Sequence, residues 1–214
     1  MFLISFEGLD GCGKTSAVRA LQDHVTRRYP DQTFVFTREP GGTGVAAAEA
    51  VRTLILSQQA EIDPLAEALL YLSARQLHIN QLIRPALRAR KIVVCDRYVD
   101  SSIAYQGGGR RLGMATIAQL NRMIVGDLMP RYTFYLQLDW ATAQARMQAQ
   151  GRTTDRLEAE DPAFFARVSA SYEKLSCQEP QRFITIDARR PQAVVLAEVI
   201  AIFDKIISTE INKD

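Results

Sequence analysis

The amino-acid sequence predicts an α/β fold, in which helices cover both faces of a five-stranded parallel sheet. Five short apolar stretches alternate with segments of helical periodicity, and this order is typical of parallel sheets. The run K-I-V-V-C at 91–95 has the composition of a strand that is buried on both faces. A length of 214 residues, with 47% hydrophobic and 23% charged residues, suits a single domain over residues 1–214.

The predicted strands are short runs of apolar and aromatic residues that end at a charged or polar residue. In chain order they lie at 2–6, 33–37, 91–95, 134–138 and 183–186.

Apolar residues that recur every three or four positions predict the helices between these strands. Asp63 followed by Pro64 has the form of a helix start. The apolar stripe that follows continues to Ala86, with Pro85 as a candidate kink. Further helices are expected from Lys14 to near Tyr29, at 46–56, at about 115–125, at 141–150, at 162–177, and through Val195 to Ile206.

The octet G-L-D-G-C-G-K-T, Gly8–Thr15, has two glycines separated by four residues and followed by Lys and Thr. Glycines allow the backbone N–H groups to point inward around an anion, and the following helix adds its N-terminal dipole. Lys14 is expected to reach the β- and γ-phosphates of ATP, and the Thr15 hydroxyl to ligate Mg²⁺. The octet therefore predicts a three-layer P-loop NTPase fold, with ATP-binding residues Gly8, Asp10, Gly11, Cys12, Gly13, Lys14 and Thr15.

Polar residues follow the other predicted strands, at the edge of the sheet where α/β proteins bind ligands. Arg38 follows the second strand, and Asp96 and Arg97 follow the third. An Asp in this place suits the carboxylate that helps to hold Mg²⁺ in P-loop enzymes, although Asp96 could also cap a turn. Arg189 and Arg190, just after the fifth strand, are candidates for contacts with adenine.

Arg38, Arg97 and, on the long helix, Arg75 suggest a second anion site next to the triphosphate. An acceptor that is itself a phosphate, whose second pKa is about 6, is already largely ionised at neutral pH. Such an acceptor needs no general base, and no base is evident in the sequence. Catalysis would then consist of positioning and electrostatic stabilisation.

The polar stretch Gly151–Arg156 interrupts the helical pattern and carries two arginines. A kinase must keep water away from the transferring phosphoryl group, and a closing segment achieves this. A lid near residues 149–158 is therefore predicted; an ordinary exposed loop is the alternative.

With these features, the chain resembles the thymidylate (dTMP) kinase family along essentially its whole length. The first matching motif identifies only a superfamily, whereas the second and third, in this order and spacing, are highly specific. The matching segments are F-E-G-L-D-G-C-G-K-T at 6–15, T-R-E-P-G-G-T at 37–43, D-R-Y at 96–98, S-S-I-A-Y-Q-G-G-G-R at 101–110 and G-R-T-T-D-R-L-E at 151–158.

The resemblance implies direct in-line phosphoryl transfer from ATP-Mg to dTMP, giving the dTDP needed for dTTP synthesis. It implies that Arg38, Arg75 and Arg97 hold the dTMP phosphate and that Asp10 meets the 3′-hydroxyl group of the sugar.

Three further positions acquire a role through the resemblance. Tyr71 falls where the family stacks an aromatic ring on thymine, and it shares a helix face with Arg75. Taken alone, Tyr71 would more often be a core residue. Ser102 falls where a polar side chain contacts the base edge, and Tyr105 where a ring disfavours ribonucleotides.

Some members of the family carry an arginine in the phosphate loop, where this chain has Asp10, Gly11 and Cys12. The chain instead resembles the bacterial arrangement, in which lid arginines supply positive charge to the transferring group. Arg156 could alternatively pair with Asp155 or Glu158, so the choice of acting arginine stays open. The expected catalytic residues are Lys14, Arg97, Arg152 and Arg156.

Other functions remain open at this level. One is another nucleoside monophosphate kinase or a broader deoxynucleotide kinase, and another is a P-loop ATPase or switch protein. The resemblance implies a homodimer, although the apolar stripe of 65–87 could equally face the sheet. A net charge of +2 gives no reason to expect a nucleic-acid partner. Without an apolar run of membrane-spanning length or a signal-peptide pattern, the protein is expected in the cytoplasm.

Overall fold

The computed structural model describes residues 1–149, 156–157 and 159–211, and it contains a parallel sheet with the strand order β2-β3-β1-β4-β5. Phe6 pairs with Asp96 on one side and with Phe134 on the other, so the carboxyl ends of the central strands meet. The five-stranded parallel sheet is as predicted. The strands are β1 (Leu3–Glu7), β2 (Phe34–Arg38), β3 (Ile92–Asp96), β4 (Tyr132–Gln137) and β5 (Phe183–Asp187).

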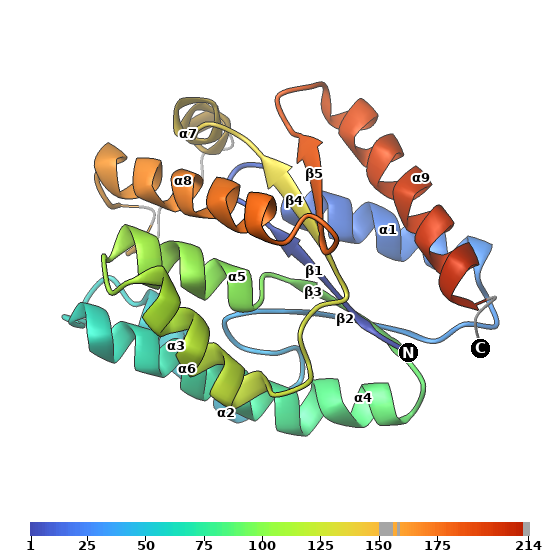
Figure 1. The fold of residues 1–214 in the computed structure, drawn as a ribbon, viewed down its shortest axis with the longest axis horizontal. Coiled ribbons are helices and arrows are strands. Elements are labelled where there is room, and N and C mark those ends of the chain that lie inside the picture. The colour runs from blue at the N-terminus through green and yellow to red at the C-terminus, as the bar shows by residue number, and fades with distance from the viewer. Residues whose placement is uncertain (150–155, 158, 212–214) are drawn as a thin grey trace.

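Helices cover both faces of this sheet (Figure 1), which makes the three-layer P-loop NTPase fold. One face is covered by α1 (Lys14–Arg28) and α9 (Gln192–Ile211). The other carries α2 (Ala46–Leu56), α3 (Pro64–His78), α4 (Arg84–Arg88), α5 (Val99–Ser102), α6 (Met114–Val125) and α8 (Pro162–Gln178), while α7 (Trp140–Ala149) follows the carboxyl end of β4. No helix among the described residues is long and apolar enough to cross a membrane.

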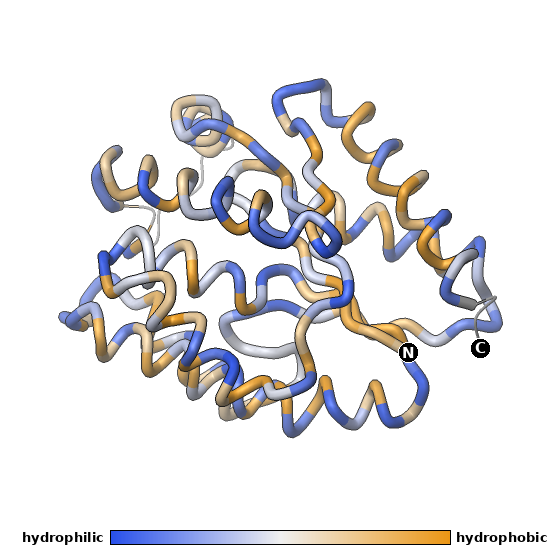
Figure 2. The backbone as a smooth tube through the Cα atoms, in the orientation of Figure 1, coloured by the Kyte–Doolittle hydropathy of each residue, from blue (hydrophilic) through white to orange (hydrophobic). Residues whose placement is uncertain are grey.

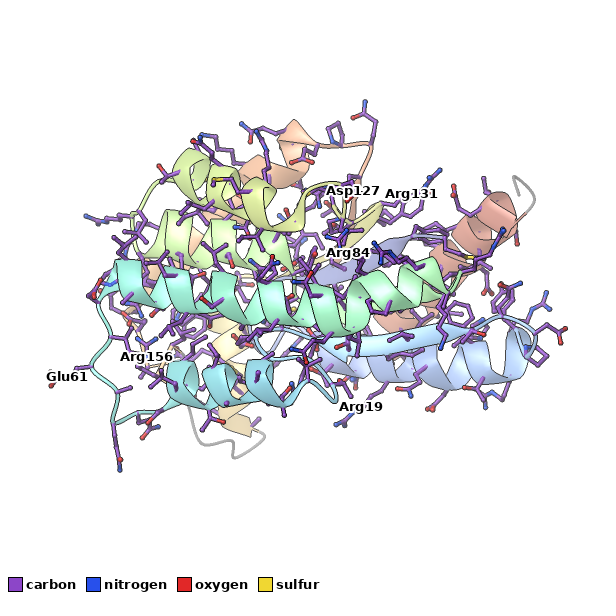
Figure 3. All side chains as sticks on the ribbon, turned by 90° about the horizontal axis from the view of Figure 1, so that it is seen from below. Arg19, Glu61, Arg84, Asp127, Arg131 and Arg156 are labelled. Atoms are coloured by element: carbon purple, nitrogen blue, oxygen red, sulfur yellow. The ribbon has the colours of Figure 1, made fainter. Side chains whose placement is uncertain are left out.

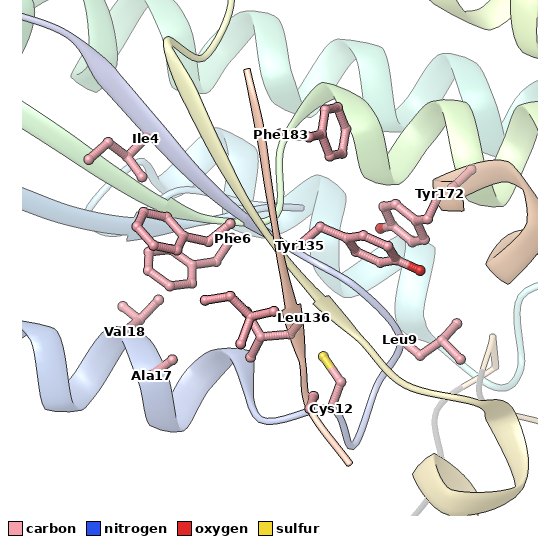
Figure 4. Packing of buried hydrophobic residues seen from close by; sticks show 14 of the residues in the cluster. Ile4, Phe6, Leu9, Cys12, Ala17, Val18, Tyr135, Leu136, Tyr172 and Phe183 are labelled. Carbon is pink, nitrogen blue, oxygen red and sulfur yellow. The ribbon is translucent and has the colours of Figure 1, made fainter. Parts of the chain in front are cut away.

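The core fills both sides of the sheet because successive strand residues point to opposite faces. On the α1 side, the ring of Phe6 stacks on Phe134 with centroids 4.9 Å apart (Figure 4). On the opposite side, Tyr135 stacks on Tyr172 of α8 at 5.2 Å. The central strands are orange mainly toward their amino ends (Figure 2), and β1 is buried along its whole length, as expected for a strand covered on both faces.

The predicted long helix is present, but it has three segments. The Asp63 side chain caps α3 by accepting hydrogen bonds from the backbone of Leu65 and Ala66, both at 3.0 Å. A π-helical turn, η1 (Ile79–Ile83), then joins α3 to α4. Pro85 follows this turn and has no N–H to donate to it. The expected irregularity therefore lies just before the proline.

The sequence analysis predicts no helix over residues 99–109, where three consecutive glycines, Gly107–Gly109, have low helix propensity. The structure corrects this: α5 continues into a π-helical turn, η2 (Ile103–Gly109). A Cβ on Gly109 would lie 2.5 Å from Cε2 of Phe164 in α8, and a Cβ on Gly107 would lie 2.9 Å from Cα of Met114. Close packing by neighbouring helices thus overrides the low helix propensity of glycine. This segment carries much of the site described next.

Candidate active site

A cleft of about 700 Å³ opens at the carboxyl ends of the strands, where ligands bind in α/β proteins. Gly8 and Ser102 do not line it, but each hydrogen-bonds to residues that do. The predicted site residues that line the cleft are Asp10, Gly11, Cys12, Gly13, Lys14, Thr15, Arg38, Tyr71, Arg75, Asp96, Arg97 and Tyr105.

The phosphate loop wraps around the ammonium group of Lys14. Its Nζ donates to the carbonyl oxygens of Gly8 at 3.1 Å and Leu9 at 2.7 Å, and the residue is only 5% exposed. Gly8 has a φ of 135°, and a Cβ there would lie 2.5 Å from the carbonyl oxygen of Leu136. Glycine is therefore required by both the backbone angle and the approach of β4. The loop has the shape predicted for a phosphate cradle, with the lysine at its centre.

The hydroxyl of Thr15 and the carboxylate of Asp96 meet beside this loop. Thr15 Oγ1 donates to Asp96 Oδ2 at 2.9 Å. The two residues come from distant parts of the chain, and the pairing of β1 with β3 brings them together. Both groups are hard oxygen donors of the kind that Mg²⁺ prefers, and together they leave most of its octahedral positions for phosphates and water. The residues present therefore fit a magnesium ion bound together with a triphosphate.

Arg97 and Tyr105 converge on Asp10 of the phosphate loop. Arg97 Nη2 donates to Asp10 Oδ1 at 2.8 Å, and the Tyr105 hydroxyl donates to Asp10 Oδ2 at 3.3 Å. The guanidinium carbon of Arg97 lies 5.1 Å from the centroid of the Tyr105 ring. Helix α5 and turn η2 hold Tyr105 in this place, so the segment missed by the sequence analysis builds one wall of the site.

Arg75 reaches the cleft from α3, but its donors are shared among protein groups. Its guanidinium is bound to Glu39 at 2.7 Å, Ser102 at 3.0 Å, Asn121, and the carbonyl oxygen of Tyr98 at 3.0 Å. The side chain is only 1% exposed. A phosphate would have to replace one of these partners. This arrangement brings Arg75 together with Ser102, and the contact of Arg75 with the dTMP phosphate stays a prediction.

Arg38 holds the carboxylate of Glu49 with two hydrogen bonds, at 2.8 and 3.1 Å. These bonds are the main reason that the pKa of Glu49 lies below its usual value. Arg52 also lines the cleft and donates to the carbonyl oxygen of Pro40 at 2.8 Å. Sequence reasoning missed Arg52, although its position one helical turn after Glu49 could have revealed it.

The lid prediction falls largely outside the described residues. Of residues 149–158, the structure describes 149, 156 and 157, so Arg152 is not among them. Arg156, which is labelled in Figure 3, lies near α2 and α3. It donates to Glu67 of α3 at 2.6 Å and to the carbonyl oxygen of Ile55 in α2 at 3.1 Å. Glu67 was not an expected partner. For Arg156 to reach a transferring phosphoryl group, this buried ion pair would first have to break.

The far end of the cleft is lined by Arg146 of α7 and by the residues that follow β5. There the guanidinium group of Arg189 donates two hydrogen bonds to the carboxylate of Asp187, at 2.8 and 2.9 Å. Arg190 pairs with Glu198. In the sheet, β5 and β3 lie on opposite sides of β1, so this end of the cleft and the end at Arg97 lie on opposite sides of the phosphate loop. The cleft therefore has room for a nucleotide on each side of Lys14.

Comparisons with known proteins agree with this geometry. A family model described as thymidylate kinase matches residues 6–199. The thymidylate kinase of Mycoplasma mobile is 40% identical over 206 residues, covering 95% of this chain and 98% of the relative. That of Enterococcus faecalis is 43% identical over 206 residues, covering 94% and 95%. The crystal structure of thymidylate kinase from Ehrlichia chaffeensis matches with a TM-score of 0.75 at 32% identity, covering 94% of this chain and 98% of that one.

Proposed function

The chain belongs to the thymidylate kinase family, and on that premise we propose that it transfers the γ-phosphoryl group of ATP to dTMP, producing dTDP and ADP. The observation that carries the proposal is the group formed by Arg97, Asp10 and Tyr105 directly beside the phosphate loop. It supplies a second site for an anion and a sugar, which a simple hydrolase would not need.

The residues divide the task between donor and acceptor. The loop amides and Lys14 bind the β- and γ-phosphates of ATP, where charge develops during transfer. Arg97, together with Arg38 and Arg52, which also line the cleft, holds the phosphate of dTMP in line with the donor. Asp10 accepts the 3′-hydroxyl group, and Tyr71 stacks on the base. Because the acceptor is already ionised, positioning and electrostatics suffice without a general base.

The function is tested by kinetics with a panel of acceptors: dTMP, dUMP, UMP, CMP, dGMP and AMP. We expect the highest kcat/KM with dTMP. Equal use of several monophosphates would favour the broader deoxynucleotide or nucleoside monophosphate kinase instead. Release of inorganic phosphate at the same rate without any acceptor would favour an ATPase or switch protein.

We propose that Mg²⁺ accompanies ATP and is held by Thr15 and Asp96, whose side chains already meet. A magnesium ion held there would neutralise negative charge on the phosphates of ATP during transfer. Asp96→Asn is expected to raise the Mg²⁺ concentration required for half-maximal activity, because one anionic ligand is lost. Asp127→Asn, at an exposed carboxylate, serves as the control. An unchanged Mg²⁺ titration of Asp96→Asn would contradict this assignment.

We further propose a homodimer formed through α2, α3 and α6, which pack side by side. Their outer surface exposes Leu54, Leu65, Leu69 and Met123, with exposed fractions between 48% and 76%. Leu69→Glu is expected to yield monomers in sedimentation experiments, whereas Val194→Glu on α9 is not. Monomeric wild-type protein would contradict the proposal. We also propose a cytoplasmic, single-domain enzyme whose segment near 149–158 closes over ATP as a lid.

A further inference from the structure

Glu7 ends β1 immediately before the phosphate loop, and its side chain is completely buried. Its Oε1 accepts the backbone N–H of Tyr98 at 2.7 Å. Its Oε2 accepts the hydroxyl of Ser101 at 2.6 Å and the hydroxyl of Tyr172 at 2.9 Å. A buried carboxylate with three donors is costly to replace, since each donor would lose its partner.

These partners of Glu7 are also partners of Arg97. Arg97 Nη1 donates to Ser101 Oγ at 3.1 Å and lies 3.5 Å from the Tyr172 hydroxyl oxygen. The same nitrogen donates to the carbonyl oxygen of Gly8, the residue after Glu7, at 2.9 Å. Glu7 therefore contacts the same residues that hold the guanidinium group of Arg97, on the side away from the cleft.

The backbone of Arg97 is held from the same strand. Its N–H donates to the carbonyl oxygen of Phe6 at 2.9 Å, and the next N–H, that of Tyr98, donates to the Glu7 carboxylate. Arg97 has a φ of 68°, a left-handed angle that is uncommon for residues other than glycine. Such a conformation persists only where its surroundings impose it. Glu7 is one of the groups that impose it here.

We propose that Glu7 is a positioning residue for phosphoryl transfer, whose carboxylate holds Arg97 in place through Ser101, Tyr172 and the backbone of Tyr98. The proposal rests on the proposed function, since it assigns Arg97 to the phosphate of dTMP. Glu7 itself does not touch either nucleotide, because it does not line the cleft.

The direction of the hydrogen bonds explains why a carboxylate is needed. An ionised Glu7 only accepts, so Ser101 and Tyr172 both turn their protons toward it and away from the guanidinium of Arg97. The Ser101 oxygen then presents lone pairs to Nη1 of Arg97. An amide or a protonated carboxyl group at position 7 would donate toward one of these hydroxyls. At least one hydroxyl proton would have to rotate, and this would disturb the contacts of Ser101 and Tyr172 with Arg97.

Burial, together with the charges around Glu7, places the titration of its carboxyl group near neutral pH. Burial is the main cause that raises the pKa of Glu7 to about 7, and the nearby Asp100 raises it further, while Arg97 opposes the shift. Asp100, on α5, is itself paired with Arg182 at 2.6 Å. The other titratable groups facing Glu7 are Tyr172 from α8 and Cys95 from β3, and burial raises the pKa of both. The carboxylate should therefore form as pH rises through about 7.

The test compares Glu7→Gln, Arg97→Ala and the double variant with the wild-type enzyme, using dTMP and ATP as substrates. We expect Glu7→Gln to lower kcat/KM for dTMP by one to two orders of magnitude, a typical cost of a misplaced catalytic contact. The KM for ATP should stay unchanged. In the Arg97→Ala background, Glu7→Gln should have little further effect, because the group that it positions is absent. A purely structural role would instead give additive losses.

The pH profile provides a second readout. The ratio of wild-type to Glu7→Gln kcat/KM should rise as pH increases through about 7, since only the wild-type carboxylate ionises there. Ionisation of the nucleotides is common to both enzymes and cancels in the ratio. Glu210→Gln is the matched control: Glu210 also accepts a tyrosine hydroxyl, that of Tyr132 at 3.0 Å, but it lies on α9 away from the cleft. It should leave the kinetics unchanged.

Unchanged dTMP kinetics in Glu7→Gln, or an equal loss in the Arg97→Ala background, would overturn the proposal. If Glu7→Gln fails to fold, Ser101→Ala and Tyr172→Phe keep the bond between Glu7 and Tyr98 and should show the same selective loss with dTMP. Unchanged kinetics in both variants would also overturn it. A wild-type enzyme that does not phosphorylate dTMP would contradict the proposed function instead, so the two failures are distinguishable.

Discussion

Replacement of Lys14 by alanine is expected to lower kcat by roughly 10²–10³-fold or more, the cost of removing one group that stabilises developing charge. The ammonium lies at the centre of the phosphate loop, where its interaction with the triphosphate strengthens in the transition state. Its described hydrogen bonds go only to the loop itself, so the sheet and its core should remain intact. Steady-state kinetics and circular dichroism measure the two quantities separately.

Lys174→Ala is the matched control, since it removes an exposed lysine on α8 outside the cleft. It should keep wild-type kcat. If Lys14→Ala retained a similar kcat with an intact fold, the loop could not be the site of phosphoryl transfer.

Arg97→Ala is expected to reduce kcat/KM for dTMP by about 10²-fold or more, with little change in the KM for ATP. A close ionic contact with the acceptor phosphate is lost, and Asp10 loses the partner that lies 2.8 Å away. Arg97→Lys should restore little activity, because a single ammonium cannot replace donors that reach Asp10, Ser101 and Gly8 together. Kinetics with dTMP varied at saturating ATP give this result directly.

The control for Arg97 is Arg131→Ala, which removes an arginine that is half exposed and pairs with Glu210 at 3.0 Å. Such surface pairs contribute little, typically about 0–1 kcal/mol, and this one is remote from the cleft. If Arg97→Ala lowered the use of ATP and left dTMP unaffected, the acceptor site would have to lie elsewhere.

Local patterns were sufficient for much of the fold. Helix α2 has the predicted bounds, and the Asp63–Pro64 start of α3 is capped as expected. These features depend on neighbouring residues, because caps and helical periodicity are decided within a few positions. The same local reasoning did not predict the helix over residues 99–109. Three glycines disfavour a helix locally, but α6 and α8 pack so closely there that only glycine fits.

The phosphate loop illustrates what the sequence determined by itself about the site. Its glycines, Lys14 and Thr15 are contiguous, so their spacing alone predicts the cradle that the structure contains. Thr15 and Asp96 were each expected to ligate Mg²⁺, and the parallel strands that precede them end at the same edge, where their side chains meet.

Only the tertiary structure decided how the arginines are used. The sequence grouped Arg38, Arg75 and Arg97 as one anion site, and the family resemblance offered Arg152 or Arg156 for the phosphoryl group without deciding between them. In the fold, Arg75 is shared among Glu39, Ser102, Asn121 and Tyr98, and Arg156 is held by Glu67. Glu7 belongs to the motif at 6–15, but nothing in the spacing of that motif indicated that its carboxylate shares hydrogen-bond partners with Arg97. A long, flexible side chain binds whichever acceptors the packed elements bring near it, and those acceptors lie tens of residues away in the chain.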